Sequence, residues 1–182
     1  MNFSEFKEKY KKIPVEHFSH NVNDSPIISV SVQTFNHAPY IKECLEGVFL
    51  QKTDLSFEIL LGEDDWEGGS REICIEYAQK YPEKIRLFLH RRENNIQVGA
   101  QPSGRFNFLY NIYGMHGKYI ALCEGDDYWT DPLKLQKQVE ILENNKTLEK
   151  ARENIAKALG SVANLYTDCF VKNGKPYILE MN

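Results

Sequence analysis

The stretch from Tyr119 to Pro132, "YIALCEGDDYWTDP", runs an apolar segment directly into three acids within four positions. Its first five residues read as a buried strand, and Asp131 followed by Pro132 is a signal for the start of a helix. Carboxylates crowded at the end of a buried strand repel one another, so the cluster needs a structural or functional reason. Two explanations are open: a solvated turn, or a site that binds a cation.

Outward from this stretch, strands and helices alternate along the whole chain. We expect strands at residues 27–32, 57–61, 85–90 and 119–123, and helices at 39–50, 70–81, 105–113 and 132–145, after a short polar N-terminal helix. Ser70 is the expected N-cap of its helix, and residues 94–104 are expected to form a loop. The alternation predicts an α/β fold with an open, mostly parallel, Rossmann-like sheet and helices on both faces.

Composition limits the kind of protein. The 182 residues carry a net charge of −4, which does not favour nucleic-acid binding, and no apolar run reaches the length of a membrane span. The basic N-terminal run, residues 7–12, is expected to be a solvated helix face, with contact to an anionic membrane as the alternative. The four cysteines lie in apolar surroundings and match no zinc spacing. We therefore expect reduced thiols in a cytoplasmic protein, with the inner face of the membrane as an alternative location.

Polar residues follow three of the predicted strands. These ends are Thr34-Phe35-Asn36, Glu63-Asp64-Asp65 and Glu124-Gly125-Asp126-Asp127. In an open α/β sheet, ligands bind beyond the carboxyl ends of the strands. The three ends are therefore expected to converge on one site.

The acids of the third end suggest a metal. In extended backbone, Glu124 and Asp126 would point to the same side, and Gly125 would let a ligand approach the chain closely. Mg²⁺ and Mn²⁺ favour carboxylate oxygens completed by water and substrate phosphates, so the pair could clamp a metal-bound diphosphate. The alternative is a turn with solvated acids. Neither a P-loop nor a dinucleotide-binding motif occurs in the chain.

Three segments carry a resemblance to a known family: "ISVSVQTFNHAPYIKECLEGVFLQ", "FEILLGEDD…REICIEYAQKYPEKIRLF" and "GKYIALCEGDDYWTDPLKLQKQVEILENN". Together they resemble family 2 glycosyltransferases with the GT-A fold, and most closely the bacterial branch with the motif E-G-D-D-Y-W. The resemblance covers about residues 26–145. It implies inverting transfer of a sugar from a nucleotide-diphosphate donor, with UDP expected, to a hydroxyl of a glycan or lipid-linked acceptor. It also implies Mg²⁺ or Mn²⁺ as cofactor and a role in cell-surface polysaccharide or glycan synthesis.

The resemblance assigns roles to the first two strand ends. Thr34 and Phe35 would contact the base and ribose, and Asn36 would shape the turn. Asp64 would accept a hydrogen bond from the base, which is usually uracil in this family.

It also assigns roles at the third strand end. Glu124 and Asp126 would hold the metal, and Asp127 would face the metal's waters or the sugar. Arg105 and Arg92 are candidate contacts of the diphosphate, with solvated loop arginines as the alternative.

The chain departs from the family pattern in two places. Gly68 stands where the family has an acid, which puts the geometry of the loop after Asp64 in doubt. After residue 145, an expected helix at 147–159 and a strand pair with a turn at 173–174 replace the usual acceptor half. That half is therefore short or truncated, and no general base can be named.

Three regions are expected: an N-terminal helix and linker at 1–25, a nucleotide-sugar-binding domain at 26–145, and an atypical tail at 146–182. The tail also resembles the end of an ATP-grasp core, in which Glu180 and Asn182 would bind metal. Two alternatives to a transferase are therefore open. One is a catalytically incomplete or truncated nucleotide-sugar-binding module, and the other is a fragment of an ATP-grasp ligase.

Overall fold

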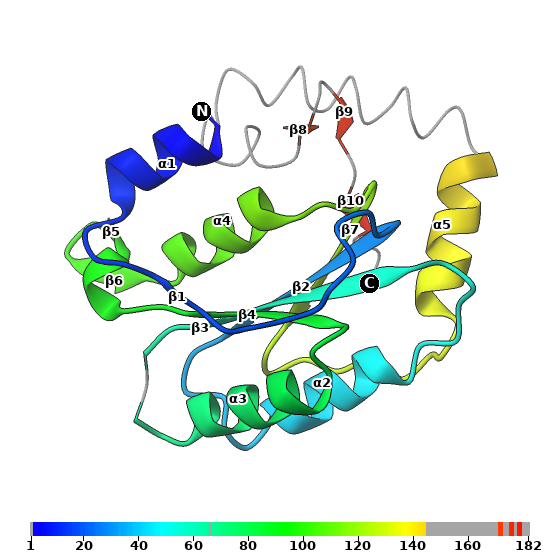
Figure 1. The fold of residues 1–182 in the computed structure, drawn as a ribbon, viewed down its shortest axis with the longest axis horizontal. Helices are drawn as coiled ribbons and strands as arrows, with labels where there is room; N and C mark the ends of the chain where they lie inside the picture. Colours follow the sequence, from blue (N-terminus) through cyan, green and yellow to red (C-terminus); the bar gives the residue numbers. More distant parts are fainter. Residues whose placement is uncertain (1, 66, 145–170, 173–174, 177, 180–182) are drawn as a thin grey trace.

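The computed structural model describes residues 2–65, 67–144, 171–172, 175–176 and 178–179. Its main sheet has six strands in the order β1-β4-β3-β2-β7-β10 (Figure 1). The strands are β1 (Glu16–His17), β2 (Ile28–Thr34), β3 (Phe57–Glu63), β4 (Ile85–Leu89), β7 (Tyr119–Glu124) and β10 (Ile178–Leu179). β1 pairs antiparallel with β4, and all other neighbours in this sheet are parallel.

Helices cover both faces of the sheet (Figure 1). They are α1 (Phe3–Tyr10), α2 (Ile41–Phe49), α3 (Ser70–Lys80), α4 (Arg105–Gly114) and α5 (Lys134–Asn144). One hydrophobic cluster joins α2, α3 and α5 to the sheet, and a second joins α1 and α4 to the opposite face. The predicted α/β fold with a mostly parallel sheet between two helical layers is confirmed.

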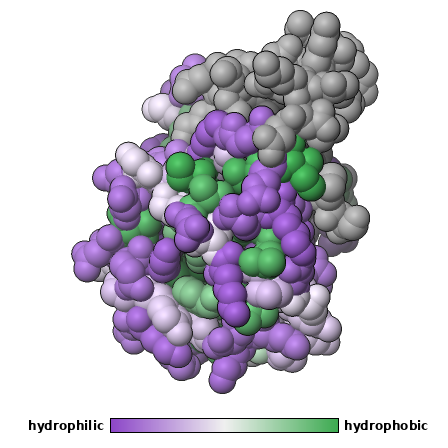
Figure 2. Space-filling model, turned by 90° about the vertical axis from the view of Figure 1, so that its right-hand side faces the viewer, coloured by the Kyte–Doolittle hydropathy of each residue, from purple (hydrophilic) through white to green (hydrophobic). Residues whose placement is uncertain are grey.

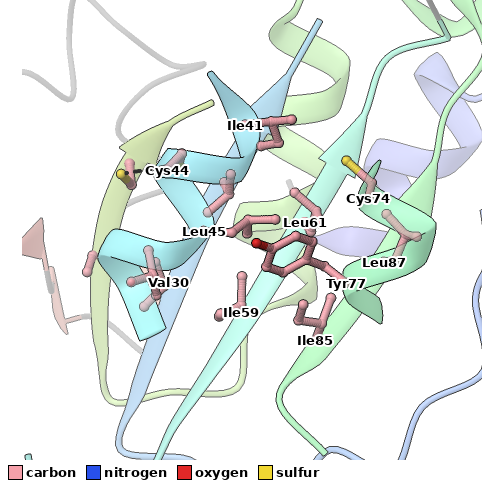
Figure 3. Packing of buried hydrophobic residues seen from close by; sticks show 14 of the residues in the cluster. Val30, Ile41, Cys44, Leu45, Ile59, Leu61, Cys74, Tyr77, Ile85 and Leu87 are labelled. Carbon is pink, nitrogen blue, oxygen red and sulfur yellow. Dashed lines mark hydrogen bonds between the residues drawn. The ribbon is translucent and has the colours of Figure 1, made fainter. Parts of the chain in front are cut away.

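The face under α2 and α3 is apolar. Val30, Ile59 and Leu61 on the strands are fully buried against Leu45 of α2 and Tyr77 of α3 (Figure 3). Burying one such aliphatic side chain stabilises the fold by about 1.5–3 kcal/mol. This layer supplies the packing that fixes the two helices on the sheet.

The face under α4 carries buried polar groups in addition to its hydrophobic cluster. The Asn111 amide donates to the carbonyls of Val32 and Leu60, at 3.1 and 3.0 Å, and the Asn107 amide donates to the carbonyl of Gly62 at 2.9 Å. A side chain at position 62 would meet Asn107 Oδ1 at 1.8 Å, so only glycine fits there. These bonds set the position of α4 along the strands that lead to the site.

Two local predictions were wrong. Residues 94–104 contain a hairpin of β5 (Ile96–Val98) and β6 (Gln101–Ser103), preceded by the 3₁₀ turn η1 (Arg92–Asn94). Gly99, with a φ of 63°, starts the two-residue turn between the strands, a position where glycine is favoured. At α3 the N-cap is Gly69 and not Ser70, because the cap has a φ of 91° that glycine adopts without strain.

The described part of the tail contains short strands. β8 (Val171–Lys172) and β9 (Lys175–Pro176) pair antiparallel around the predicted turn at 173–174, and β10 pairs with β7. That turn, the expected helix at 147–159, Glu180 and Asn182 lie outside the described residues.

The described surface carries few large apolar side chains. Figure 2 shows a mostly hydrophilic face in which hydrophobic residues are scattered. No helix in the described part of the chain is both long and apolar enough to cross a membrane. Cys44, Cys74 and Cys123 are buried free thiols, as expected, and Cys169 lies outside the described residues.

Candidate functional site

The end of β2 lies between the ends of β3 and β7 and is hydrogen-bonded to both. The Asp64 N–H donates to the carbonyl of Thr34 at 3.0 Å, and the Gly125 N–H donates to the carbonyl of Gln33 at 2.8 Å. The three polar strand ends therefore converge, as expected for parallel strands in one sheet.

Asp64 is the most deeply buried acid at this edge that lacks a full set of partners. It is 1% exposed, and its Oδ2 accepts from Asn95 Nδ2 at 3.0 Å and from Arg92 Nη1 at 3.2 Å. Its Oδ1 is buried and has no hydrogen-bond partner in the described part of the chain. Burial raises the pKa of Asp64, and the donors on Asn95 and Arg92 oppose that rise. A buried acceptor without a donor costs free energy, so this oxygen is a position where a ligand's N–H would be stabilising.

A cation–aromatic pair lies beside Asp64. The Arg92 guanidinium stacks over the ring of Phe35, 4.2 Å from its centroid, while the same side chain donates to Asp64. Thr34 Oγ1, at the end of β2, is also buried without a partner among the described residues. Asn36 is exposed and has a left-handed φ of 57°, which turns the chain away from the sheet. A cation–aromatic pair beside a buried acceptor without a donor suits a planar heterocycle that offers an N–H group.

The acidic motif after β7 forms a tight turn. The Asp127 N–H donates to the carbonyl of Glu124 at 2.9 Å. Glu124 ends β7 in extended backbone, but the chain turns directly after it, so the expectation that extended backbone continues to Asp126 was wrong. Gly125 is buried, and a Cβ there would meet Gln33 O, His37 Nδ1 and Thr34 Cβ at 2.8–2.9 Å. Glycine is therefore required for the turn to sit against the end of β2.

The side chains of this turn are open to solvent. Glu124, Asp126 and Asp127 are exposed, and Asp126 Oδ2 lies 3.8 Å from His37 Nε2. Within the described residues, no three His, Cys, Asp or Glu side chains are close enough to hold a metal ion by themselves. Two accessible carboxylates nevertheless fit Mg²⁺ or Mn²⁺, since these ions commonly take one or two carboxylates and complete their shell with water and phosphate.

Sequence reasoning missed part of this arrangement. Asn95 was not singled out, and Arg92 was expected near a diphosphate but contacts Asp64 and Phe35. No role was assigned to His37 from the sequence, although it lies beside Asp126. Arg105 is the first residue of α4 and is half-buried at the end of the β5–β6 hairpin. The polar run after β4 was the signal that could have pointed to Asn95.

Comparison with known proteins identifies the family of the chain and several relatives. The model of the family described as "Glycosyl transferase family 2" matches residues 29–151. Uncharacterized protein Mb1547 of Mycobacterium bovis is 41% identical over 119 residues, which are 65% of this chain and 31% of the relative. Uncharacterized glycosyltransferase EpsJ of Bacillus subtilis is 30% identical over 123 residues, which are 66% of this chain and 32% of the relative.

A solved structure shares the fold. The mannosyltransferase PcManGT from Pyrobaculum calidifontis, in complex with GDP-Man and Mn²⁺, superposes with a TM-score of 0.54 at 18% identity. The superposition covers 77% of this chain and 38% of that protein. The chain spans about a third of the length of Mb1547 and of EpsJ. The family model matches more than half of the residues of this chain, and the chain therefore belongs to glycosyl transferase family 2.

Proposed function

We propose that the chain binds a UDP-sugar and transfers the sugar to a hydroxyl group of a glycan or lipid-linked acceptor. The observation that carries the proposal is Asp64 Oδ1, a buried acceptor without a donor beside the Phe35–Arg92 stack. Uracil offers a single ring N–H between two carbonyl groups, so one free carboxylate oxygen is a suitable partner for it. Thr34 and Asn95, at the ends of neighbouring segments, would complete the contacts with the base and ribose.

The diphosphate would lie at the turn after β7. Glu124 and Asp126 would hold Mg²⁺ or Mn²⁺, which supplies positive charge to the diphosphate leaving group. Asp127 and Arg105 would contact the sugar and the phosphates. The compact Gly125 keeps this turn against the end of β2 and so fixes the spacing between the base and diphosphate positions.

The transfer itself would be inverting and would take place on the cytoplasmic side, in the synthesis of cell-surface polysaccharide or glycan. Inversion needs a carboxylate within hydrogen-bond reach of the attacking hydroxyl, and that residue stays unassigned. Support for this part comes from the family and from the sequence resemblance to its E-G-D-D-Y-W branch.

Calorimetry with UDP and UDP-sugars, with and without Mn²⁺, tests donor binding. We expect Mn²⁺-dependent binding of UDP that Asp126→Ala weakens at least tenfold. Asp131→Ala is the matched control, because Asp131 is an exposed acid five positions on that pairs with Lys137 at 2.8 Å. UDP binding that keeps its Mn²⁺ dependence in Asp126→Ala would remove the proposed metal site. Binding of ATP and not of UDP would favour the ATP-grasp alternative.

A second candidate is donor binding without transfer. It is favoured by the lack, within the described residues, of a carboxylate assigned to activate an acceptor hydroxyl. A product assay with a UDP-sugar and a panel of hydroxyl acceptors separates the two candidates. Glycosylated product supports the transferase, and hydrolysis of the donor without transfer to any acceptor supports the binding module.

A further inference from the structure

Arg71, the second residue of α3, joins the segments on either side of the base-recognition position. Its Nε donates to Glu63 Oε2 at 2.6 Å, and its Nη2 donates to the carbonyl of His90 at 2.8 Å. The same Nη2 lies 3.4 Å from Asp65 Oδ1. One guanidinium therefore contacts both chain neighbours of Asp64 and the end of β4.

The turn that presents Asp64 depends on these contacts. Asp65 has a φ of 49°, a left-handed conformation that a residue with a side chain adopts only at an energetic cost. Its N–H donates to Glu63 Oε2 at 3.2 Å, the oxygen that also accepts from Arg71. Glu63 is fully buried, so its carboxylate needs the Arg71 cation beside it. Arg71 therefore fixes the carboxylate of Glu63, and that carboxylate accepts the hydrogen bond that stabilises the left-handed conformation of Asp65.

The second anchor of Arg71 lies next to the other half of the base site. The carbonyl of His90 is two residues before Arg92, which donates to Asp64 and stacks on Phe35. The His90 N–H also donates to the carbonyl of Glu63 at 2.8 Å. Arg71 adds a side-chain connection at the same place and so helps to set the distance between Arg92 and Asp64. The described contacts of Arg71 do not include the turn at 124–127, so the proposed diphosphate position is independent of it.

We infer that Arg71 is a positioning residue for nucleobase selection, an assignment that rests on the proposed binding of UDP. It does not touch the base. It aims Asp64 Oδ1 at the ring N–H that uracil has and cytosine lacks. Loss of Arg71 should therefore reduce discrimination between the two bases more than it reduces binding of the shared ribose and diphosphate.

The test compares the dissociation constants of UDP and CDP, both with Mn²⁺, in the full chain. We expect the parent to prefer UDP at least tenfold and Arg71→Gln to reduce that preference below threefold. Arg86→Gln is the matched structural control, because Arg86 pairs with the buried Glu58 at 2.7 Å at the opposite end of β3. It should lower stability and leave the UDP preference unchanged. In the Asp64→Asn background, Arg71→Gln should cause no further loss of preference.

The outcomes separate this inference from the proposed function. A parent chain that binds neither nucleotide, or that binds both equally, overturns base reading by Asp64 and the role of Arg71 with it. A parent that prefers UDP while Arg71→Gln keeps the full preference overturns the role of Arg71 alone. If Arg71→Gln does not fold, Arg71→Lys serves, because one ammonium cannot span Glu63 and the His90 carbonyl together. We expect an intermediate preference there, and an unchanged one contradicts the inference.

Discussion

Two buried carboxylates at opposite ends of β3 are treated differently by the fold. Glu58, near the start of the strand, accepts from Ser29 Oγ at 2.6 Å, from the His116 N–H at 3.0 Å and from Arg86 Nε at 2.7 Å. Asp64, directly after the strand, has donors on Oδ2 only, and its Oδ1 has no partner within the described residues. Both side chains are almost completely buried.

The difference in hydrogen bonding between Glu58 and Asp64 distinguishes a structural carboxylate from one that can bind a ligand. A buried charge that is fully hydrogen-bonded holds its neighbours in place and gives nothing to a ligand. A buried charge with one free acceptor costs stability in the absence of a ligand and gains a bond when a donor arrives. Such a cost is typical of a binding site.

The largest expected effect is on stability, at Glu58. Glu58→Gln leaves the buried Arg86 without its main partner, although Asp24 still pairs with it at 2.8 Å. We expect the free energy of unfolding to fall by about 3 kcal/mol, as for other broken buried pairs. Urea unfolding measures this, and calorimetry should find the affinity for UDP unchanged within twofold. A large loss of UDP affinity with little loss of stability would break the comparison.

The complementary substitution is Asp64→Asn, for which we expect a large loss of UDP affinity and a small change in stability. It should weaken UDP binding about thirtyfold, or roughly 2 kcal/mol, because the charged acceptor for the base is lost. The free energy of unfolding should change by less than about 1 kcal/mol, since removing a desolvated charge offsets the weaker bonds to Asn95 and Arg92. Urea unfolding and calorimetry on the same variant check both expectations. A destabilisation as large as that of Glu58→Gln would show that Asp64 is structural.

A third buried ionisable group, His90, extends the comparison to pH. Burial, with the nearby charges of His17 and Arg71, lowers the pKa of His90 to about 3. In the unfolded chain the imidazole takes up a proton below about pH 6.5, whereas the folded one stays neutral. Keeping His90 neutral therefore costs the folded state nothing above about pH 6.5. As the pH falls, the free energy of unfolding decreases by about 1.4 kcal/mol per pH unit between roughly pH 6 and 4, because only the unfolded chain takes up the proton.

His90→Phe should remove this part of the pH dependence. Neither ring nitrogen of His90 has a partner in the described part of the chain, so an apolar ring should be at least as stable at pH 7. Urea unfolding at pH 7, 6, 5 and 4 measures both proteins. Equal slopes for parent and variant would contradict the assignment.

The smallest expected effect is at Phe35. Phe35→Leu removes the ring on which Arg92 stacks and should weaken UDP binding about threefold, within the 0.5–1 kcal/mol range of partly exposed cation–π pairs. Phe49→Leu is the control, because the Phe49 ring packs against the Tyr81 ring, 4.1 Å between centroids, and joins α2 to the end of α3. Calorimetry should find normal UDP affinity in the control. Equal losses in both variants would point to a general loss of packing.

The main elements could be predicted because their signals are local. Apolar runs gave β2, β3, β4 and β7 within about two residues of their bounds, and the parallel order then required the three polar ends to meet. The hairpin at 96–103 was missed because each of its strands has only three residues and is mostly exposed. The pairing there depends on a single glycine turn and not on a hydrophobic pattern.

Roles at the site were harder to predict because they depend on contacts between distant residues. Asn95 and Arg92 reach Asp64 from about thirty residues away, across the β3–β4 neighbour pair. The predicted backbone geometry of the acidic motif was also wrong, because two acids separated by one residue fit a strand and a turn equally well. The bond between Asp127 and Glu124 decides for the turn.

β1 has a consequence for solubility. Without it, β4 would be the outer strand on that side, with the buried apolar run from Ile85 to Leu89 presenting unpaired N–H and carbonyl groups. Two exposed polar residues, Glu16 and His17, pair with that run antiparallel, and the Phe18 N–H adds a bond to the carbonyl of Leu87. Short polar edge strands of this kind give another sheet little to pair with. The N-terminal segment therefore protects the main sheet from edge-to-edge pairing with another molecule.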